Sequence, residues 1–244
     1  MAQWNESEHP RDNDGKFTDK GAGASGTAKT SIERVRNIFE ARKVEKVEKN
    51  TQKSYNINKP IPAGEINGIS FYQTNKNDFH KSLQTAYESI DLDKRWRVTV
   101  HKPKKYIGSK LYITKGGSCV AVTSDGDIIS VCKNQSGGEH GVAKALLQKA
   151  VKEGGKKLDA YGQYLYEYYT RNGFEPVSWT EWDEKQAPDD WKKAKEQGLS
   201  VEEEPVIFYK YTGKQTKATY EDFINKVKAS PSYDEAKEQR DTEV

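Results

Sequence analysis

The segment with the strongest chemical signal joins a strand-like run to a glycine-rich loop and then to an amphipathic helix. Residues 127–132 have the composition of a strand, the loop holds Gly137, Gly138 and Gly141, and residues 143–151 repeat apolar side chains at helical spacing. Small residues let the backbone approach a phosphate closely, and the free N–H groups at a helix start point toward it. We therefore expect an anion site here, against the simpler alternative of a tight turn in which a glycine caps the helix.

The other residue types that carry chemistry are few and scattered. Four histidines, at positions 9, 80, 101 and 140, lack the spacing of metal ligands, so no metal site is predicted. The sequence identifies no His or Asp partner for Cys132, and we interpret it and Cys119 as small core residues. No Gly-Lys-Ser/Thr follows the loop, which excludes a P-loop, and the order of elements excludes a Rossmann fingerprint.

Residues 138–147 resemble the GNAT superfamily of N-acetyltransferases. In that family the pyrophosphate of acyl-CoA lies on a loop of pattern Gln/Arg-x-x-Gly-x-Gly/Ala that precedes a long helix. Gly141 and Ala143 occupy the second and third of these places, and Gly138 stands where the family has Gln or Arg. This departure removes one polar contact to the pyrophosphate, which Gln135 is a candidate to supply from upstream.

Residues 165–174 carry a second match, to the family's Phe-Tyr-x-x-x-Gly-Phe signature. We predict that Gly173 ends a helix in the left-handed conformation and that Phe174 packs back on its last turn. The resemblance implies that Tyr169 is the general acid toward the departing CoA thiolate, since a phenol is a plausible proton donor to it. Tyr168 and Tyr166 are alternative acids, and packing is the alternative role for all three.

The resemblance implies a mixed-sheet α/β (α+β) fold, a GNAT-like acyltransferase domain, over residues 66–212. It implies acetyl-CoA or another acyl-CoA as co-substrate and direct transfer to an amine. The strand before the loop would splay from its neighbour and bind the pantetheine arm, and the loop would bind the pyrophosphate. The expected CoA-binding residues are Ile129, Val131, Cys132, Gly138, His140, Gly141, Val142 and Ala143. Glu65, Asp127 and His101 are the candidates for a general base, and the sequence does not distinguish them.

Composition limits the classes of partner and compartment. Forty Lys and Arg residues nearly cancel 37 Asp and Glu residues, so no strong global field would draw the protein to DNA or to anionic lipid. Two cysteines cannot form a disulfide framework in 244 residues, and neither a signal peptide nor a membrane span is evident. We expect a soluble, cytoplasmic protein with reduced thiols and no membrane or nucleic-acid partner.

The elements that must position these motifs divide into four segments. Residues 1–29 form a polar tail, 30–65 a charged helix and linker, 66–212 the domain, and 213–244 a C-terminal helix with a charged tail. Within the domain, strands are expected at 66–74, 96–101, 111–114, 119–123, 127–132, 157–161, 174–182 and 205–211. Helices are expected near residues 79–90, 143–151 and 165–172, and an Asp125-Gly126 turn should close a hairpin.

The N-terminal residues 4–17 resemble a short tag of proteins from bacteriophage and prophage head-gene neighbourhoods. That resemblance implies a phage-encoded protein, whose tail could dock on a phage structural protein by ordering on contact. An inert solvated tail is the alternative.

Together these features predict a phage-encoded, acyl-CoA-dependent N-acyltransferase that acts in the bacterial cytoplasm or is associated with the virion. Its acceptor would be a host protein or a small amine. The alternative is a GNAT-like scaffold without catalysis that binds other proteins. Nucleic-acid binding by residues 34–53 is a weaker possibility, because glutamates interleave with the basic side chains there.

Overall fold

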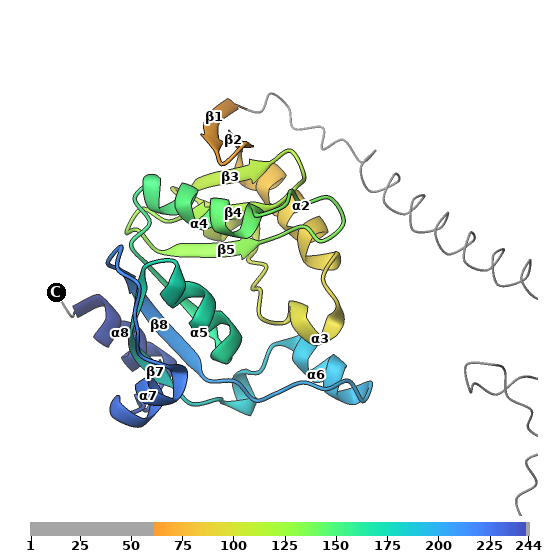
Figure 1. Ribbon diagram of the computed structural model, residues 1–244. Coiled ribbons are helices and arrows are strands. Elements are labelled where there is room, and N and C mark those ends of the chain that lie inside the picture. Colours follow the sequence, from red (N-terminus) through yellow and green to blue (C-terminus); the bar gives the residue numbers. More distant parts are fainter. Residues whose placement is uncertain (1–60, 243–244) are drawn as a thin grey trace, which may run out of the picture. The chain divides into compact units, whose positions relative to one another are not determined.

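Two antiparallel sheets organise the chain, and Figure 1 shows them in the computed structural model, which describes residues 61–242. The first sheet has the order β1 (Ile61–Ile66), β2 (Ile69–Gln73), β3 (Lys110–Thr114), β4 (Cys119–Val122) and β5 (Ile128–Cys132). The second has the order β6 (Lys157–Tyr161), β8 (Val206–Tyr211) and β7 (Phe174–Thr180). The predicted mixed α+β class is therefore confirmed. The predicted polar tail, phage-like tag and charged helix fall outside the described residues.

Seven helices and two short 3-10 turns accompany these strands in the described residues. The helices are α2 (Lys76–Glu88), α3 (Leu92–Arg95), α4 (Val142–Lys152), α5 (Gly162–Arg171), α6 (Asp189–Glu196), α7 (Tyr220–Lys226) and α8 (Tyr233–Thr242). The 3-10 turns are η2 (Pro103–Tyr106) and η3 (Glu184–Gln186).

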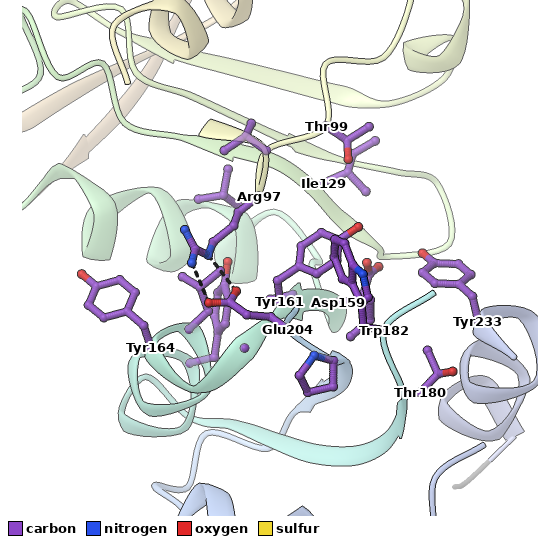
Figure 2. Close-up of a pocket in the computed structure, with 18 of the residues that line it drawn as sticks. Arg97, Thr99, Ile129, Asp159, Tyr161, Tyr164, Thr180, Trp182, Glu204 and Tyr233 are labelled. Carbon is purple, nitrogen blue, oxygen red and sulfur yellow. Dashed lines mark hydrogen bonds and ion pairs between the residues drawn. The ribbon is translucent and has the colours of Figure 1, made fainter. Parts of the chain in front are cut away.

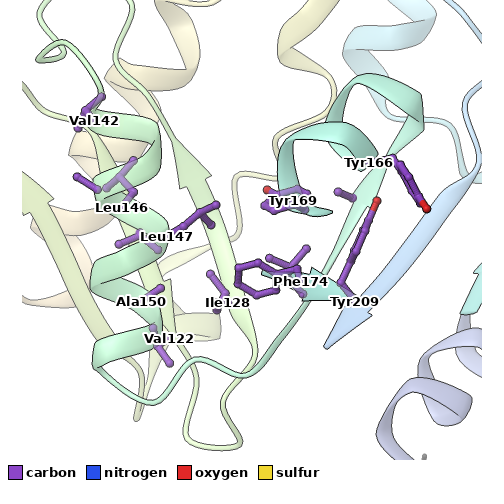
Figure 3. Close-up of a cluster of buried hydrophobic side chains, with 14 of the residues drawn as sticks. Val122, Ile128, Val142, Leu146, Leu147, Ala150, Tyr166, Tyr169, Phe174 and Tyr209 are labelled. Carbon is purple, nitrogen blue, oxygen red and sulfur yellow. The ribbon is translucent and has the colours of Figure 1, made fainter. Parts of the chain in front are cut away.

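Helices α2 and α4 cover opposite faces of the first sheet because its strands alternate in side-chain direction. Leu111 and Ile113 of β3 pack with Phe79 and Leu83 of α2, whereas Tyr112 packs with the α4 side chains. On the second sheet, α5 shares the main core with Leu158 and Ala160 of β6, and α8 packs with Val206 and Phe208 on the opposite face. Figure 3 shows Tyr166 and Tyr169 of α5 in this core. Both sheets are therefore enclosed on two sides.

The turn chemistry of the central elements follows the sequence. Gly126 has φ +84, and the N–H of Thr123 donates to the carbonyl of Asp127 at 2.9 Å, which closes the predicted β4–β5 hairpin. Helix α4 ends before Gly154, and α5 ends before Gly173, both of which take positive φ. Phe174 is buried and its ring lies 5.9 Å from that of Tyr169, so the predicted helix stop is confirmed.

The N-terminal boundary of the domain differs from the prediction. Residues 61–65, expected as linker, form strand β1 together with Ile66, and this strand pairs with β2 through the turn at Asn67 and Gly68. Both turn residues have positive φ, 52° and 78°, as a two-residue hairpin of this type requires. The buried Lys149 of α4 also donates to the carbonyl of Ala63 at 2.7 Å. The domain therefore includes residues 61–66.

The strand expected at residues 96–101 is wrong. Helix α3 precedes this segment, and the N–H of Val98 donates to the carbonyl of Arg95, which makes a turn. Trp96 is buried beside α6, and Arg97 pairs with Glu204. These tertiary contacts override the alternating pattern.

The prediction of a charged C-terminal tail is also wrong. Its residues form α8, which packs against β7 and β8 and buries Ala236 and Arg240 completely. The helix has few apolar residues, so a buried ion pair rather than an apolar stripe marks its inner face. The charged segment between β7 and β8 contains α6, where Asp190 accepts from Arg95 at 2.6 Å.

We predict that Phe174→Ala lowers the free energy of unfolding by about 3–5 kcal/mol, because it removes a fully buried ring between Tyr169 and Tyr211. Urea denaturation would measure the change. Ile107→Ala is the control, since Ile107 is 64% exposed and should change stability by no more than about 0.5 kcal/mol. Equal losses for both variants would contradict this packing.

Candidate functional site

A cleft of about 2150 Å³ opens where β5 and β6 part (Figure 2). The two strands run parallel and meet at an isolated bridge between Asp127 and Lys157. Past that bridge, β5 pairs with β4 alone among the described strands. The backbone of β5 on the cleft side is therefore free to hydrogen-bond a ligand.

A bulge in β5 turns this strand at the cleft. Cys132 pairs with Cys119, but Ile129 pairs with Ala121, so β5 holds one more residue than β4 over this stretch. Ser130, within the bulge, has φ +54, a conformation uncommon for a residue other than glycine. Its hydroxyl shares a 2.8 Å hydrogen bond with that of Tyr106. Bulges of this kind re-aim backbone groups and concentrate near functional sites.

The predicted pantetheine-contacting residues divide into two groups. Ile129 and Val131 line the cleft. Cys132 does not line it, because its side chain is buried in the core on the α2 side of the sheet. Burial raises the pKa of the Cys132 thiol to about 12, so this residue stays protonated at neutral pH. The interpretation of both cysteines as core residues is confirmed by their burial.

The glycine-rich loop after β5 is held against the β3–β4 turn by side-chain hydrogen bonds. The Asn134 N–H donates to Ser118 Oγ at 3.1 Å, and its Nδ2 donates to the Gly116 carbonyl at 2.8 Å. The Glu139 carboxylate accepts from Thr114 Oγ1 at 2.9 Å and from the Gly116 N–H at 3.0 Å. The loop conformation is thus set before any ligand binds.

Close packing explains why a glycine stands at position 138. A Cβ atom there would collide with the carbonyl oxygen of Asn134 and lie 3.0 Å from Ser118 Oγ. The Gly138 N–H donates to that same Asn134 carbonyl at 2.8 Å. The Gln or Arg of the GNAT pattern has no room in this loop conformation.

The start of α4 presents free donors, as the sequence predicts. Gly141 has φ +75, and the N–H of Val142 donates to the Glu139 carbonyl. The N–H groups of Ala143 and Lys144 donate to no acceptor within residues 61–242. A helix N-terminus with unsatisfied N–H groups favours an anion.

The five loop candidates lie in different surroundings. Ala143 lines the cleft, whereas Val142 is buried in the main core. His140 and Gly141 are exposed to solvent, and Gly138 is half-buried against the β3–β4 turn. Gln135, the proposed substitute contact, lines the cleft.

The structure separates the three candidate tyrosines of α5. The Tyr166 hydroxyl donates to the Ala218 carbonyl at 3.1 Å, which gives it a structural role. Tyr168 and Tyr169 both line the cleft. Tyr169 makes no side-chain hydrogen bond to a described residue, and burial raises its pKa, so it holds its proton at neutral pH.

The base candidates from the sequence also separate. Glu65 lies on β1 and does not line the cleft, whereas His101 and Asp127 do. Burial lowers the pKa of His101, and Lys105 lowers it further, so the imidazole is neutral at pH 7. Both Asp127 oxygens accept from the buried Arg240 guanidinium, at 3.2 and 3.1 Å.

Sequence reasoning missed Asp159, which lies on β6 and lines the cleft. Burial raises the pKa of this carboxyl to about 6, and the neighbouring Asp127 charge raises it too. A signal was present, because an aspartate in the middle of a short predicted strand is disfavoured unless it has a role.

Comparison of the chain with protein-family models, curated proteins and solved structures returned no match. Within the described part of the chain, no group of three or more His, Cys, Asp or Glu residues is placed to hold a metal ion. No helix between residues 61 and 242 is long and apolar enough to cross a membrane.

We predict that Gly138→Ala destabilises the protein by about 1–3 kcal/mol, because the added methyl group forces the loop away from Asn134. Urea denaturation would report the loss. Gly137→Ala is the matched control, since a Cβ there meets its nearest neighbour at 3.4 Å. The packing explanation fails if the two variants are equally stable.

Proposed function

We propose that this chain is an acyl-CoA-dependent N-acyltransferase with a GNAT-like fold, which moves an acetyl or related acyl group to an amine. The observation that carries the proposal is the parting of β5 from β6 beyond the Asp127–Lys157 bridge. That separation is what the resemblance implies for the strand before the loop. It leaves a free strand edge beside a free helix N-terminus.

The described residues offer complementary groups to two parts of an acyl-CoA. The N–H groups at the start of α4 suit the pyrophosphate, and the edge of β5 suits the amide-rich pantetheine arm. The cleft exceeds the usual pocket range of about 300–1,000 Å³, which leaves room for a second substrate.

The chemistry assigned to these groups is direct transfer. An amine attacks the thioester carbonyl, whose developing negative charge would be stabilised by an N–H of the β5 bulge. Tyr169 then gives its proton to the departing thiolate. Its raised pKa keeps that proton available at neutral pH.

The rival proposal, a scaffold without catalysis, has one observation in its favour. Gly138 removes the polar side chain that the GNAT pattern places at the pyrophosphate, and the loop has no room for one. The phage origin, cytoplasmic location and docking through residues 4–17 rest on the sequence alone. Measured acyl-CoA binding separates the two functions.

We predict that the protein binds acetyl-CoA in the micromolar range and that Ala143→Glu weakens binding at least about tenfold. The new carboxylate would lie at the helix start, where it suits the helix dipole but repels a pyrophosphate. Ala143→Gln is the matched control of equal size without charge. Isothermal titration calorimetry would compare all three proteins. A folded wild type that does not bind acetyl-CoA would overturn the transferase proposal.

We predict that Tyr169→Phe leaves acetyl-CoA affinity unchanged but slows CoA release with a panel of primary amines by about 10²–10⁴-fold. The change removes the proton donor without removing the packed ring. Thiol release from acetyl-CoA is the readout, and Tyr211→Phe, on the partly exposed Tyr211, is the control. Unchanged turnover in Tyr169→Phe would remove this residue from the mechanism.

A further inference from the structure

We propose that the face of β6 opposite Tyr169 is the acceptor subsite, that it takes a primary alkylammonium group, and that Asp159 is the base that removes its proton. This inference rests on the proposed acyl transfer. Its carrying observation is the alternation of side chains along β6, which places an acid and an aromatic ring on one face.

The two faces of β6 look onto different environments. Leu158 and Ala160 belong to the core that also holds Tyr169 of α5. Asp159 and Tyr161, which alternate with them, point to the opposite face of the sheet. Both line the cleft (Figure 2). A thioester held in the cleft would therefore have the proton donor Tyr169 on one side and the carboxylate of Asp159 on the other.

Arg240 decides which of two neighbouring carboxylates is free. Its guanidinium is fully buried and bonds both oxygens of Asp127, whereas it lies 4.0 Å from the nearer oxygen of Asp159. The Asp159 side chain keeps 31% of its surface exposed. Asp127 is thus paired within the protein, and Asp159 is left to accept a proton from a ligand. Arg240 is a positioning residue in this arrangement.

The charged and titratable groups around Asp159 come from four elements and the start of β5. Asp127 precedes β5, and α8 contributes Tyr233, Lys237 and Arg240. Three more tyrosines interact electrostatically with it from the other elements: Tyr161 of β6, Tyr169 of α5 and Tyr209 of β8. Burial and Asp127 outweigh the nearby cations, and the pKa of Asp159 is about 6. The carboxylate is therefore mostly ionised at pH 7 and can still hold a transferred proton.

An aromatic wall beside Asp159 suits a cation. Tyr161 and Trp182 line the cleft, with ring centroids 6.1 Å apart, and Trp96 packs edge-on against both, at 5.1 and 5.7 Å. Aromatic faces attract ammonium groups. Four exposed acids line the cleft from the segments around Trp182 and before β8: Glu181, Asp183, Glu202 and Glu203.

These groups select a positively charged amine over a neutral or anionic acceptor. An unbranched alkylammonium can reach past the aromatic wall to Asp159, as a lysine side chain or a polyamine arm would. Both sources share this chemistry, and the test below distinguishes them.

The acyl transfer releases one proton overall. The Asp159 carboxylate takes one proton from R–NH₃⁺, and the freed amine pair forms the C–N bond to the thioester carbon. The C–S bond then breaks, and the leaving thiolate takes the Tyr169 proton. The remaining surplus proton on the amide nitrogen returns to Tyr169 through water, and Asp159 releases its proton to solvent. The products are the amide, CoA thiol and one proton.

The binding test uses the full-length chain with spermidine and, separately, an acetylated peptide amide containing one lysine, both at pH 7.5 by calorimetry. We predict that at least one binds and that Asp159→Asn weakens it at least about tenfold. Asp234→Asn, on the exposed part of α8, is the matched control. Binding of the peptide alone assigns a lysine side chain, and binding of spermidine alone assigns a polyamine. Equal binding by wild type and Asp159→Asn, or no amine binding beside bound acetyl-CoA, overturns the subsite.

The pH test separates a base from a structural residue. We predict that kcat/KM for the amine falls below about pH 6 in the wild type, because Asp159 becomes protonated there. Asp159→Asn should lose this acid limb of the pH profile, and its rate should fall by about 10²–10⁴-fold. Arg240→Gln should move the limb to higher pH, since the Asp127 charge is no longer offset, and Arg240→Lys should restore it. A limb that persists in Asp159→Asn overturns the assignment.

A readout without turnover keeps the two proposals separate. Carbon-13 NMR of aspartate carboxyls should show a group titrating near pH 6 that Asp159→Asn removes. Asp159-dependent amine binding without acetyl-CoA binding supports the ammonium subsite and overturns the transferase. Acetyl-CoA binding with an Asp159-independent amine overturns the subsite and leaves the transferase standing.

Discussion

The site depends on one constraint, which is that β5 and β6 pair at a single point and then part. At that point the Gly126 carbonyl accepts from the N–H of Lys156 at 2.7 Å, and Lys157 joins the Asp127 bridge. Beyond it, the bulge at Ser130 turns β5 while β6 continues with β8. Each strand therefore keeps one regular partner, and the space between them becomes a cleft instead of a continuous sheet.

Ion pairs, one of them buried, hold the closed end of that cleft. Lys157 pairs with Asp125 at 2.9 Å and with Asp241 at 3.0 Å, and Arg240 pairs with Asp127. A buried guanidinium is costly unless its donors are satisfied, and removing one partner strands the other in the interior. The C-terminal helix is thus tied to the first residues of β5. Its docking and the geometry of the cleft are parts of one arrangement.

Packing around the glycine-rich loop determines which side chains the loop can carry. Asn134 and Glu139 bind the loop to the β3–β4 turn, and this contact leaves no space for a side chain at Gly138. The free N–H groups at the start of α4 are kept all the same. An anion bound at this helix start would therefore meet backbone donors and not a side chain at position 138.

Local patterns in the sequence determined most of the elements, and the tertiary structure decided which of them meet. The apolar stripe of α4, the Asp125-Gly126 turn and the Gly173 stop were all readable, because each depends on residues within a few positions of one another. The strand at Ile61–Ile66 was not predicted, although the Asn67-Gly68 pair is typical of the hairpin turn that follows it. The segment 96–101 was misread, because the burial of Trp96 against Trp182 acts across more than 80 positions of the chain. The roles of Asp159 and Arg240 could not be predicted from their neighbours in the sequence. These roles depend on the ion pair between Arg240 of the last helix and Asp127, just before β5, and only the folded chain brings these charges together.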